Sequence, residues 1–408
     1  MTYAIFIWHA VFLAITMSMI DLNTVFPALI TSLGGSKIVF GLLYSIILGA
    51  PYLFNVVFGH FIAARPYRRK FLLIGIYLRA ASFLGMAGFT YLFGKGHPEA
   101  VVASFFVWTF IFSASGGFAG ISYTDIVAKL VERGKRGKLY AVRQFAAGIA
   151  SFLGGLIVAR AFSLRTLTFP ANYALLLAIG SAGLVIASAA FWFIREPASV
   201  VESRPSLRSR FREIPGILRE HHSFLRFIVV ENLSSFSLML MPFYMIYAKK
   251  EIGVADRYIG IYLLFQIGGT IASNIAWGWI SQRFGSRSVV RSCILLGALI
   301  PLVALGLSPL GAGAFSAVFL LLGFVRSGRQ VGFEPYLLDI LPEGDRPVYL
   351  GIRGTLNVFT VVLPFLGGVL IHAAGYPPVF ALVVAVMLAA FFLLGGRPRA
   401  PADGSPLA

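Results

Sequence analysis

Apolar residues are grouped in long runs that alternate with short polar stretches along almost the whole chain. Because a helix needs roughly 20 apolar residues to cross the hydrocarbon core of a bilayer, each run predicts a membrane span. The pattern therefore predicts an all-α membrane protein with twelve transmembrane helices. The expected spans are residues 3–30, 38–63, 71–93, 100–126, 139–162, 170–194, 224–247, 258–280, 289–307, 314–340, 349–372 and 377–394.

One long hydrophilic stretch, residues 195–222, divides this pattern into two similar parts. It contains six arginines and four glutamates, and six apolar runs lie on each side of it. We therefore expect two six-helix membrane domains, residues 1–194 and 223–396. The stretch 195–222 is the expected linker between them, and residues 397–408 form the expected tail.

The composition agrees with a membrane protein. Of the 408 residues, 58% are hydrophobic and only 12% are charged, which is about half the charged share of an average soluble domain. A soluble fold of this length could not bury so much apolar surface. The first span is also too long for the apolar region of a secretion signal, so we expect it to stay in the membrane.

The net charge of +18 would suggest a nucleic-acid partner in a soluble protein, but the placement of the charges excludes that interpretation here. Of the 34 Lys and Arg residues, 24 fall in loops on the linker side of the predicted membrane and seven on the opposite side. Cytoplasmic loops of membrane proteins carry such an excess of basic residues. The linker and both termini are therefore predicted to be cytoplasmic, in a multi-pass protein of the cell membrane.

This topology makes a direct prediction for cysteine labelling in intact cells. Cysteines introduced at Ser206 and Ser405 should be protected from a membrane-impermeant thiol reagent, because both positions are expected on the cytoplasmic side. A cysteine at Gly96, between the third and fourth spans, should react. Labelling of position 206 from outside would reverse the predicted orientation.

The sequence contains few features of an enzyme or a metal protein. A single cysteine, Cys293, excludes an intrachain disulfide and a cysteine-based metal cluster. Neither a phosphate-binding loop nor a zinc-binding His-Glu-x-x-His motif is present. We therefore expect no enzymatic activity, no cofactor and no bound metal.

Two basic loops carry a recognisable motif. The loop after the eighth span reads GWISQRFGSR and follows the pattern Gly-x-x-x-Asp-Arg-x-Gly-x-Arg, with Gln282 in place of the Asp. The loop after the second span, GHFIAARPYRRK, is a weaker copy with alanines at the Asp-Arg positions. In this motif the chain resembles the major facilitator superfamily. The motif does not identify a subfamily.

Internal repetition strengthens this resemblance. Phe152-Leu-Gly-Gly155 in the fifth span recurs as Phe365-Leu-Gly-Gly368 in the eleventh, and Pro27 of the first span recurs as Pro242 of the seventh. Parallel repeats of six spans are the architecture of that superfamily. The resemblance implies that spans one, four, seven and ten line a central cavity, and that spans two, five, eight and eleven flank it.

Polar residues inside these spans are the candidates for substrate or ion binding, because polar and charged groups are costly in a bilayer. Several share one helix face through spacings of three or four residues. In span ten we expect Arg326 and Arg329 to attract an anionic or strongly hydrogen-bonding part of the substrate, with Glu334 holding both arginines in place. The candidate substrate and coupling residues are Asp21, Asn23, Glu231, Asn232, Gln266, Asn274, Arg326, Arg329, Gln330, Glu334 and Asn357.

A second set of charged residues lies at the linker-side ends of the spans. Asp125 with Arg143 is predicted to form one part of a cytoplasmic gate, and Asp339 with Arg353 the equivalent part in the second half. Arg283 of the motif loop is expected to belong to the same gate.

Each of these assignments has a structural alternative. Asp21 could be paired near the end of its span, and Glu231 could be a gate or interface contact. The amides of span eight could serve only as hydrogen bonds between helices, each worth about 1 kcal/mol. The polar stripe of span ten could be a cytoplasmic extension of that helix.

The pattern as a whole favours a secondary active transporter that moves a small molecule by alternating access. Proton coupling through Asp21 is the simplest energy source, since a carboxyl group in a span can load and release a proton; efflux is one possible direction. The alternatives are a uniporter or an uptake permease for a sugar or an organic anion. A membrane sensor or enzyme on the same scaffold is the alternative from another class. The expected partners are the substrate, H+ and the lipid bilayer, and the protein is expected to be a monomer.

Overall fold

The computed structural model describes residues 2–63, 65–198, 216–341 and 346–395. Within these ranges the chain is helical, with short connections. The first half contains α1 (Thr2–Met19), α2 (Val25–Ser32), α3 (Lys37–Ala63), α4 (Arg69–Phe93), α5 (Pro98–Leu130), α6 (Arg133–Ser163), α7 (Ala171–Ala189) and η1 (Ala190–Phe193).

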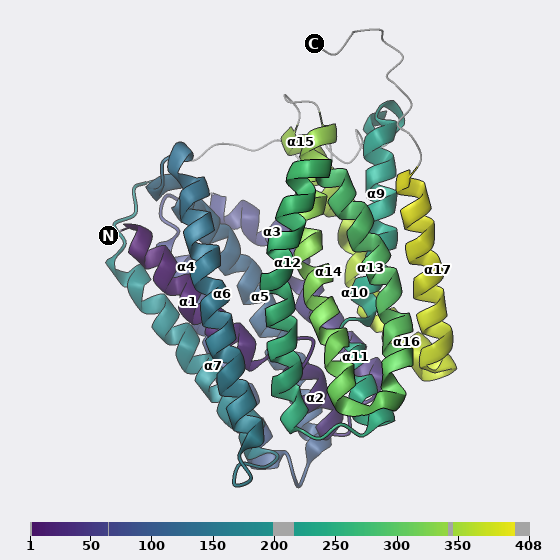
Figure 1. Cartoon of the computed structure of the whole chain (residues 1–408). Coiled ribbons are helices and arrows are strands. Elements are labelled where there is room, and N and C mark those ends of the chain that lie inside the picture. Colours follow the sequence, from purple (N-terminus) through teal and green to yellow (C-terminus); the bar gives the residue numbers. More distant parts are fainter. Residues whose placement is uncertain (1, 64, 199–215, 342–345, 396–408) are drawn as a thin grey trace.

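The second half begins after the linker. It contains α9 (His222–Ser234), α10 (Phe236–Leu240), α11 (Phe243–Tyr247), η2 (Ala248–Ile252), α12 (Arg257–Phe284), α13 (Ser286–Leu307), η3 (Ser308–Leu310), α14 (Gly311–Ile340), α15 (Arg346–Leu356), η4 (Asn357–Val361), α16 (Leu363–Ala374) and α17 (Tyr376–Gly395). In Figure 1 the helices before the linker form one bundle and those after it form a second bundle beside the first.

The predicted all-α membrane fold is confirmed. Nine segments of the described chain are long and apolar enough to cross a membrane, and one of them, Ser286–Ile340, contains both α13 and α14. Two shorter apolar helices, Tyr3–Met19 and Lys37–Pro51, cover the first two predicted spans. Every predicted run coincides with at least one helix, and the count of twelve crossings itself stays a prediction.

Three predicted spans are broken rather than continuous. The first is interrupted between α1 and α2, the seventh is divided into α9, α10 and α11, and the eleventh passes through the 3-10 turn η4. Such interruptions are tolerated inside a membrane only where the backbone is buried in protein or faces a water-filled cavity. The interruptions of the first and seventh spans lie among buried residues, whereas η4 contains none.

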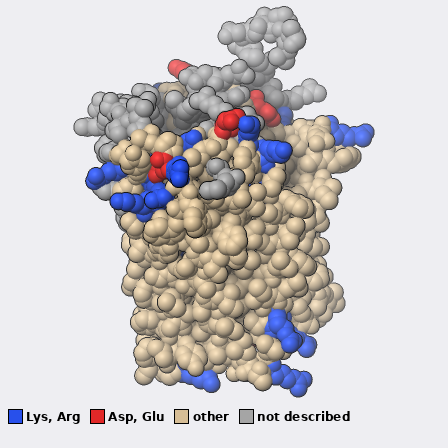
Figure 2. All heavy atoms as spheres, turned by 90° about the vertical axis from the view of Figure 1, so that its left-hand side faces the viewer, with Lys and Arg blue, Asp and Glu red and all other residues tan. Residues whose placement is uncertain are grey.

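The surface has the distribution of charge that a membrane requires. Figure 2 shows Lys and Arg gathered toward the end of the molecule at which η1 ends and α9 begins, which we call the linker side, with a broad band lacking charged residues below it on that face. Large apolar side chains such as Phe145, Ile275 and Phe392 are exposed on the helices. In a bilayer such side chains face lipid at no hydrophobic cost.

The two bundles touch each other mainly on the side opposite the linker. There α3 packs against α16, and α6 packs against α12. At Gly41 a side chain would collide with the carbonyl group of Pro364, and at Gly260 it would collide with the backbone of Ala159. The two glycines therefore allow close approach of helices from different bundles.

Parts of the predicted organisation lie outside the described residues. These include residues 199–215 of the linker, the tail from residue 396 onward, and the side chains of residues 59–64 in the first motif copy. The predicted domain boundaries stay predictions.

Candidate functional site

The break between α1 and α2 is built around Asp21. Its Oδ1 accepts hydrogen bonds from the backbone N–H of Asn23 at 3.0 Å and from the hydroxyl of Thr24 at 3.0 Å. Its main-chain carbonyl accepts the N–H of Phe26 at 3.0 Å. Aspartate side chains that bond to a backbone N–H two residues ahead replace helical hydrogen bonds and favour a turn. The sequence pattern did not predict this interruption.

At this break Asp21 meets the other bundle. Gln266 of α12 donates to Asp21 Oδ2 at 3.2 Å, and Arg326 Nη1 of α14 lies 3.9 Å from the same oxygen. Within the first bundle, the hydroxyl of Tyr44 donates to Asn23 Oδ1 at 3.4 Å. We call these five residues the Asp21 junction. It brings together one carboxylate from the first half and one arginine from the second.

The two charged groups of the junction differ in exposure. The Asp21 side chain is 11% exposed, whereas that of Arg326 is 53% exposed. At 3.9 Å the pair is also longer than a charge-assisted hydrogen bond, which measures about 2.7–2.9 Å. Arg326 therefore has room to bind a second anionic group.

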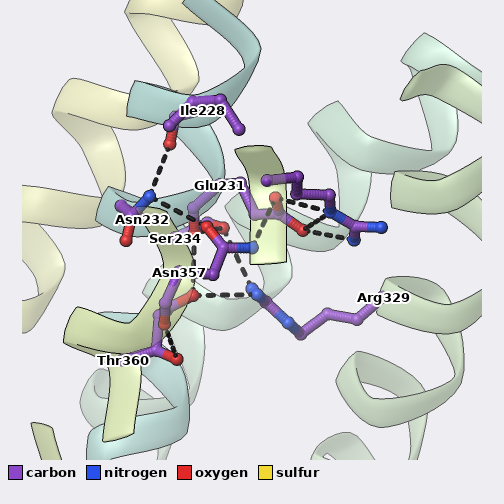
Figure 3. A network of polar contacts seen from close by, with 9 residues as sticks. Ile228, Glu231, Asn232, Ser234, Arg329, Asn357 and Thr360 are labelled. Carbon is purple, nitrogen blue, oxygen red and sulfur yellow. Dashed lines mark hydrogen bonds and ion pairs between the residues drawn. The ribbon is translucent and has the colours of Figure 1, made fainter. Parts of the chain in front are cut away.

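A second polar cluster lies inside the C-terminal bundle (Figure 3). Arg353 approaches both carboxylate oxygens of Glu231: its Nε donates at 2.9 and 3.1 Å and its Nη2 at 2.5 Å. Asn357 donates to Glu231 Oε2 at 2.9 Å, and Asn232 donates to Asn357 Oδ1 at 3.0 Å. Because the Glu231 side chain is only 5% exposed, this bidentate pair is shielded from solvent.

Arg329 completes this cluster without reaching a carboxylate. Its Nη1 donates to the hydroxyl of Ser234 at 2.9 Å, and its Nη2 donates to that of Ser235 at 3.0 Å. Both hydroxyls in turn donate to the main-chain carbonyl of Glu231 at 2.8 Å. We call Glu231, Asn232, Ser234, Ser235, Arg329, Arg353 and Asn357 the Glu231 cluster.

The predicted stripe on span ten is only partly assembled as expected. Arg326, Gln330 and Glu334 are exposed along α14. The prediction that Glu334 holds the two arginines is wrong, because Arg326 faces Asp21 and Arg329 bonds two serines. Spacing along one helix identified the stripe but could not show what faces it.

Asn274 lies in a contact between helices. Its Oδ1 accepts a hydrogen bond from the hydroxyl of Ser327 at 2.5 Å, which joins α12 to α14. Of the amides predicted on span eight, Gln266 alone is seen to reach the other bundle.

The charged residues on the linker side form a network different from the predicted one. Asp125 forms ion pairs with Arg68 and, at 2.9 Å, with Lys129. Lys129 also contacts Glu196 at 2.5 Å. The predicted pairing of Asp125 with Arg143 is wrong. The Arg143 guanidinium instead lies 5.0 Å from the centre of a tyrosine ring, that of Tyr123.

Glu196 is the residue of this network that the sequence interpretation missed. Its carboxylate accepts the backbone N–H groups of Arg68 and Arg69 at 2.7 to 2.8 Å, at the N-terminus of α4. A negative charge at a helix N-terminus is stabilising. The sequence did contain a signal for Glu196. It lies two residues after the sixth predicted span, on the same side of the membrane as the basic loop that contains Arg68 and Arg69.

The second predicted gate pair is also replaced. Asp339 accepts a hydrogen bond from the hydroxyl of Ser286, while Arg353 is held by Glu231. The predicted pairing of Asp339 with Arg353 is therefore wrong. Arg283 lies over two aromatic rings near the end of its own helix, at 5.7 Å from each ring centre.

Comparison with known proteins agrees with this architecture. The family model described as Major Facilitator Superfamily matches residues 7–248 and 227–407. An uncharacterised protein of Mycobacterium tuberculosis is 26% identical over 304 residues, which is 72% of this chain. The chain spans 58% of the length of that relative.

Solved structures resemble the whole chain. A bacterial homologue of the iron transporter ferroportin in its inward-facing state is 15% identical, with a TM-score of 0.72 over 96% of this chain and 97% of the other. A bacterial homologue of ferroportin in its outward-facing state is 16% identical, with a TM-score of 0.61 over 97% and 98%.

The apolar helices indicate a multi-pass membrane protein, and its fold is similar to that of solved transporter structures. The chain belongs to the Major Facilitator Superfamily, whose model matches nearly its whole length. The resemblance inferred from the motif and the repeats is confirmed.

Proposed function

We propose that this protein is a proton-coupled secondary active transporter of the cell membrane, with the linker and both termini in the cytoplasm. The observation that carries the proposal is the Asp21 junction. A carboxylate stands at a helix break inside the membrane and links one bundle to the other through Gln266 and Arg326. Substrate and ion sites of such transporters lie at interrupted helices between the two repeats.

The arrangement of the bundles supports alternating access. Close packing at Gly41 and Gly260 holds the two bundles together on the side opposite the linker. The higher TM-score to an inward-facing than to an outward-facing structure agrees with that arrangement, 0.72 against 0.61. We therefore assign the structure to the state that is open toward the linker. Rocking the bundles to the opposite state would separate the contacts at both glycines.

The Asp21 junction gives a physical link between proton binding and this motion. The ionised carboxylate attracts Arg326 and accepts the Gln266 amide. A proton on Oδ2 removes the charge that attracts Arg326 and occupies the oxygen that accepts the amide. Protonation therefore weakens the contact between the bundles, while deprotonation strengthens it.

Transport in reconstituted vesicles tests the proposal. Ligands are first found by thermal shift of the purified protein, because a compound that binds only the folded state raises its apparent stability. A ligand found in this way is expected to accumulate in proteoliposomes when a pH gradient is imposed, and the accumulation should collapse when a protonophore is added. Equilibration without accumulation would indicate a uniporter. Ligand binding without any flux would favour a sensor.

A further inference from the structure

Two arginines of α14 have only a distant carboxylate, or none, among their described direct contacts. Arg329 donates to two serine hydroxyls and lies 4.6 Å from the centre of the Phe333 ring. Both hydroxyls already donate to a carbonyl. Arg326 lies 3.9 Å from Asp21 and is largely exposed. By contrast, Glu231 is fully engaged by Arg353 and Asn357. The charges of Arg326 and Arg329 are therefore incompletely neutralised by their described direct contacts.

A third arginine, Arg79 of α4, adds to this excess from the first bundle. Its Nε is buried without a hydrogen-bond partner. Its Nη2 lies 3.9 Å from Met17 Sδ, and its guanidinium lies 4.4 Å from the centre of the Phe112 ring. Met17 lies near the end of α1, four residues before Asp21 in the sequence, so Arg79 contacts the last part of α1. Its described contacts include no carboxylate.

Cations in this position need a counter-ion. An ionised group inside a bilayer is retained where it pairs with an opposite charge or lines an aqueous path. Guanidinium groups bind carboxylate and phosphate oxygens with two parallel hydrogen bonds. The excess of arginine near the Asp21 junction is therefore suited to an anionic ligand.

We infer that the substrate carries a carboxylate or phosphate group that binds Arg326 in competition with Asp21. This inference rests on the proposed transport function and specifies its substrate class. When Asp21 is ionised, its carboxylate neutralises Arg326 and opposes binding of the anion. When Oδ2 carries a proton, Arg326 is released and binds the anion, while the positive charge of Arg329, three residues further along α14, adds to the attraction.

This competition determines the direction of coupling. Proton and anion favour the same state of the junction, so they bind together and leave together. The expected transport is therefore symport of H+ with the anion rather than exchange. The charged and titratable groups that face Asp21 are Arg326 of α14 and Tyr44 of α3, and its other neighbours are the amides of Gln266 and Asn23 and the hydroxyl of Thr24.

Equilibrium binding tests the inference without transport. The probes are lactate, succinate, citrate, inorganic phosphate and glucose 6-phosphate, with glucose and glycerol as uncharged controls. Calorimetry with the purified protein at pH 5.5 and 7.5 should show binding of at least one anion. After correction for the ionisation of the probe itself, binding should be tighter at pH 5.5 by up to about tenfold per pH unit. Buffers of different ionisation enthalpy should report that the protein takes up about one proton per bound anion, beyond any proton taken up by the probe. The probe that binds best also distinguishes carboxylate from phosphate.

Two variants and a control locate the site. Arg326→Gln should weaken anion binding about tenfold or more, because a hydrogen bond to a charged group is lost. Asp21→Asn should bind the anion equally well at both pH values after correction for the ionisation of the probe. Arg291→Gln removes an exposed arginine that lies 4.5 Å from the Phe391 ring on α17, and it should bind as the wild type does. Each variant must keep the wild-type elution profile and unfolding temperature.

The outcomes separate this inference from the proposed function. Absence of binding by every anion, equal binding by Arg326→Gln, or tighter binding at higher pH would each overturn the inference. Gradient-driven accumulation of an uncharged probe would also overturn it and would leave the proposed transport intact. Anion binding with the expected pH dependence but without flux would instead contradict the transport function.

Discussion

Replacing Glu231 with alanine is expected to lower the free energy of unfolding by about 3–5 kcal/mol, because it removes one partner of a buried ion pair. The change takes away three short contacts with Arg353 and one with Asn357. It leaves the Arg353 guanidinium without this counter-ion, although the Arg353 side chain is only 22% exposed. Thermal unfolding in detergent should show a fall of several degrees.

The matched control is Glu132→Ala, which breaks the ion pair with Lys135 on the surface. Both side chains of that pair are mostly exposed, so solvent screens the interaction and no measurable change is expected. The double variant Glu231→Ala with Arg353→Leu should recover part of the stability, since much of the loss comes from a buried arginine charge that has lost Glu231 as its counter-ion. Equal stability of Glu231→Ala and Glu132→Ala would show that the Glu231 cluster does not stabilise the bundle.

Asp21→Asn is expected to abolish gradient-driven accumulation of substrate while exchange of substrate across the membrane continues. The asparagine oxygen can still accept the bonds from Asn23 and Thr24, so the break between α1 and α2 should persist. The amide cannot take up a proton, so the variant has no means of coupling at this position. Accumulation and exchange are measured in the same proteoliposomes.

Asp256→Asn serves as the control for this experiment. Asp256 pairs with Lys249 near the end of the protein opposite the linker, and its side chain is 40% exposed. Its removal should leave accumulation at the wild-type rate. If Asp21→Asn also accumulates substrate at that rate, Asp21 is not the coupling site.

The helices were predictable from the sequence because a bilayer restricts the backbone strongly. Without water, each buried peptide group must bond within its own helix, so long apolar runs become helices. The interruptions were not predictable from apolar content. The break at Asp21 depends on a side chain bonding to its own backbone, and the 3-10 turn that begins at Asn357 lies in a run that was predicted to be one helix.

The candidate site was predictable as a set of residues but not as a set of pairs. The cost of polar groups in lipid singled out Asp21, Gln266 and Arg326, and the structure brings these three side chains together. Their partners depend on how helices distant in sequence pack. Asp21 and Gln266 are 245 residues apart, and Arg353 joins Glu231, 122 residues away, in place of the nearer Asp339.

Distances between spin labels on the two bundles test the central claim, alternating access, most directly. After replacement of the native Cys293, one pair is placed at Gly96 and Leu310, on the side opposite the linker, and a second at Lys70 and Phe284, on the linker side. Without ligand we expect a short distance for the first pair and a long one for the second. With a binding anion at pH 5.5, a second population should appear in which the first distance lengthens and the second shortens. Single, unchanged distributions for both pairs in every condition would contradict the account.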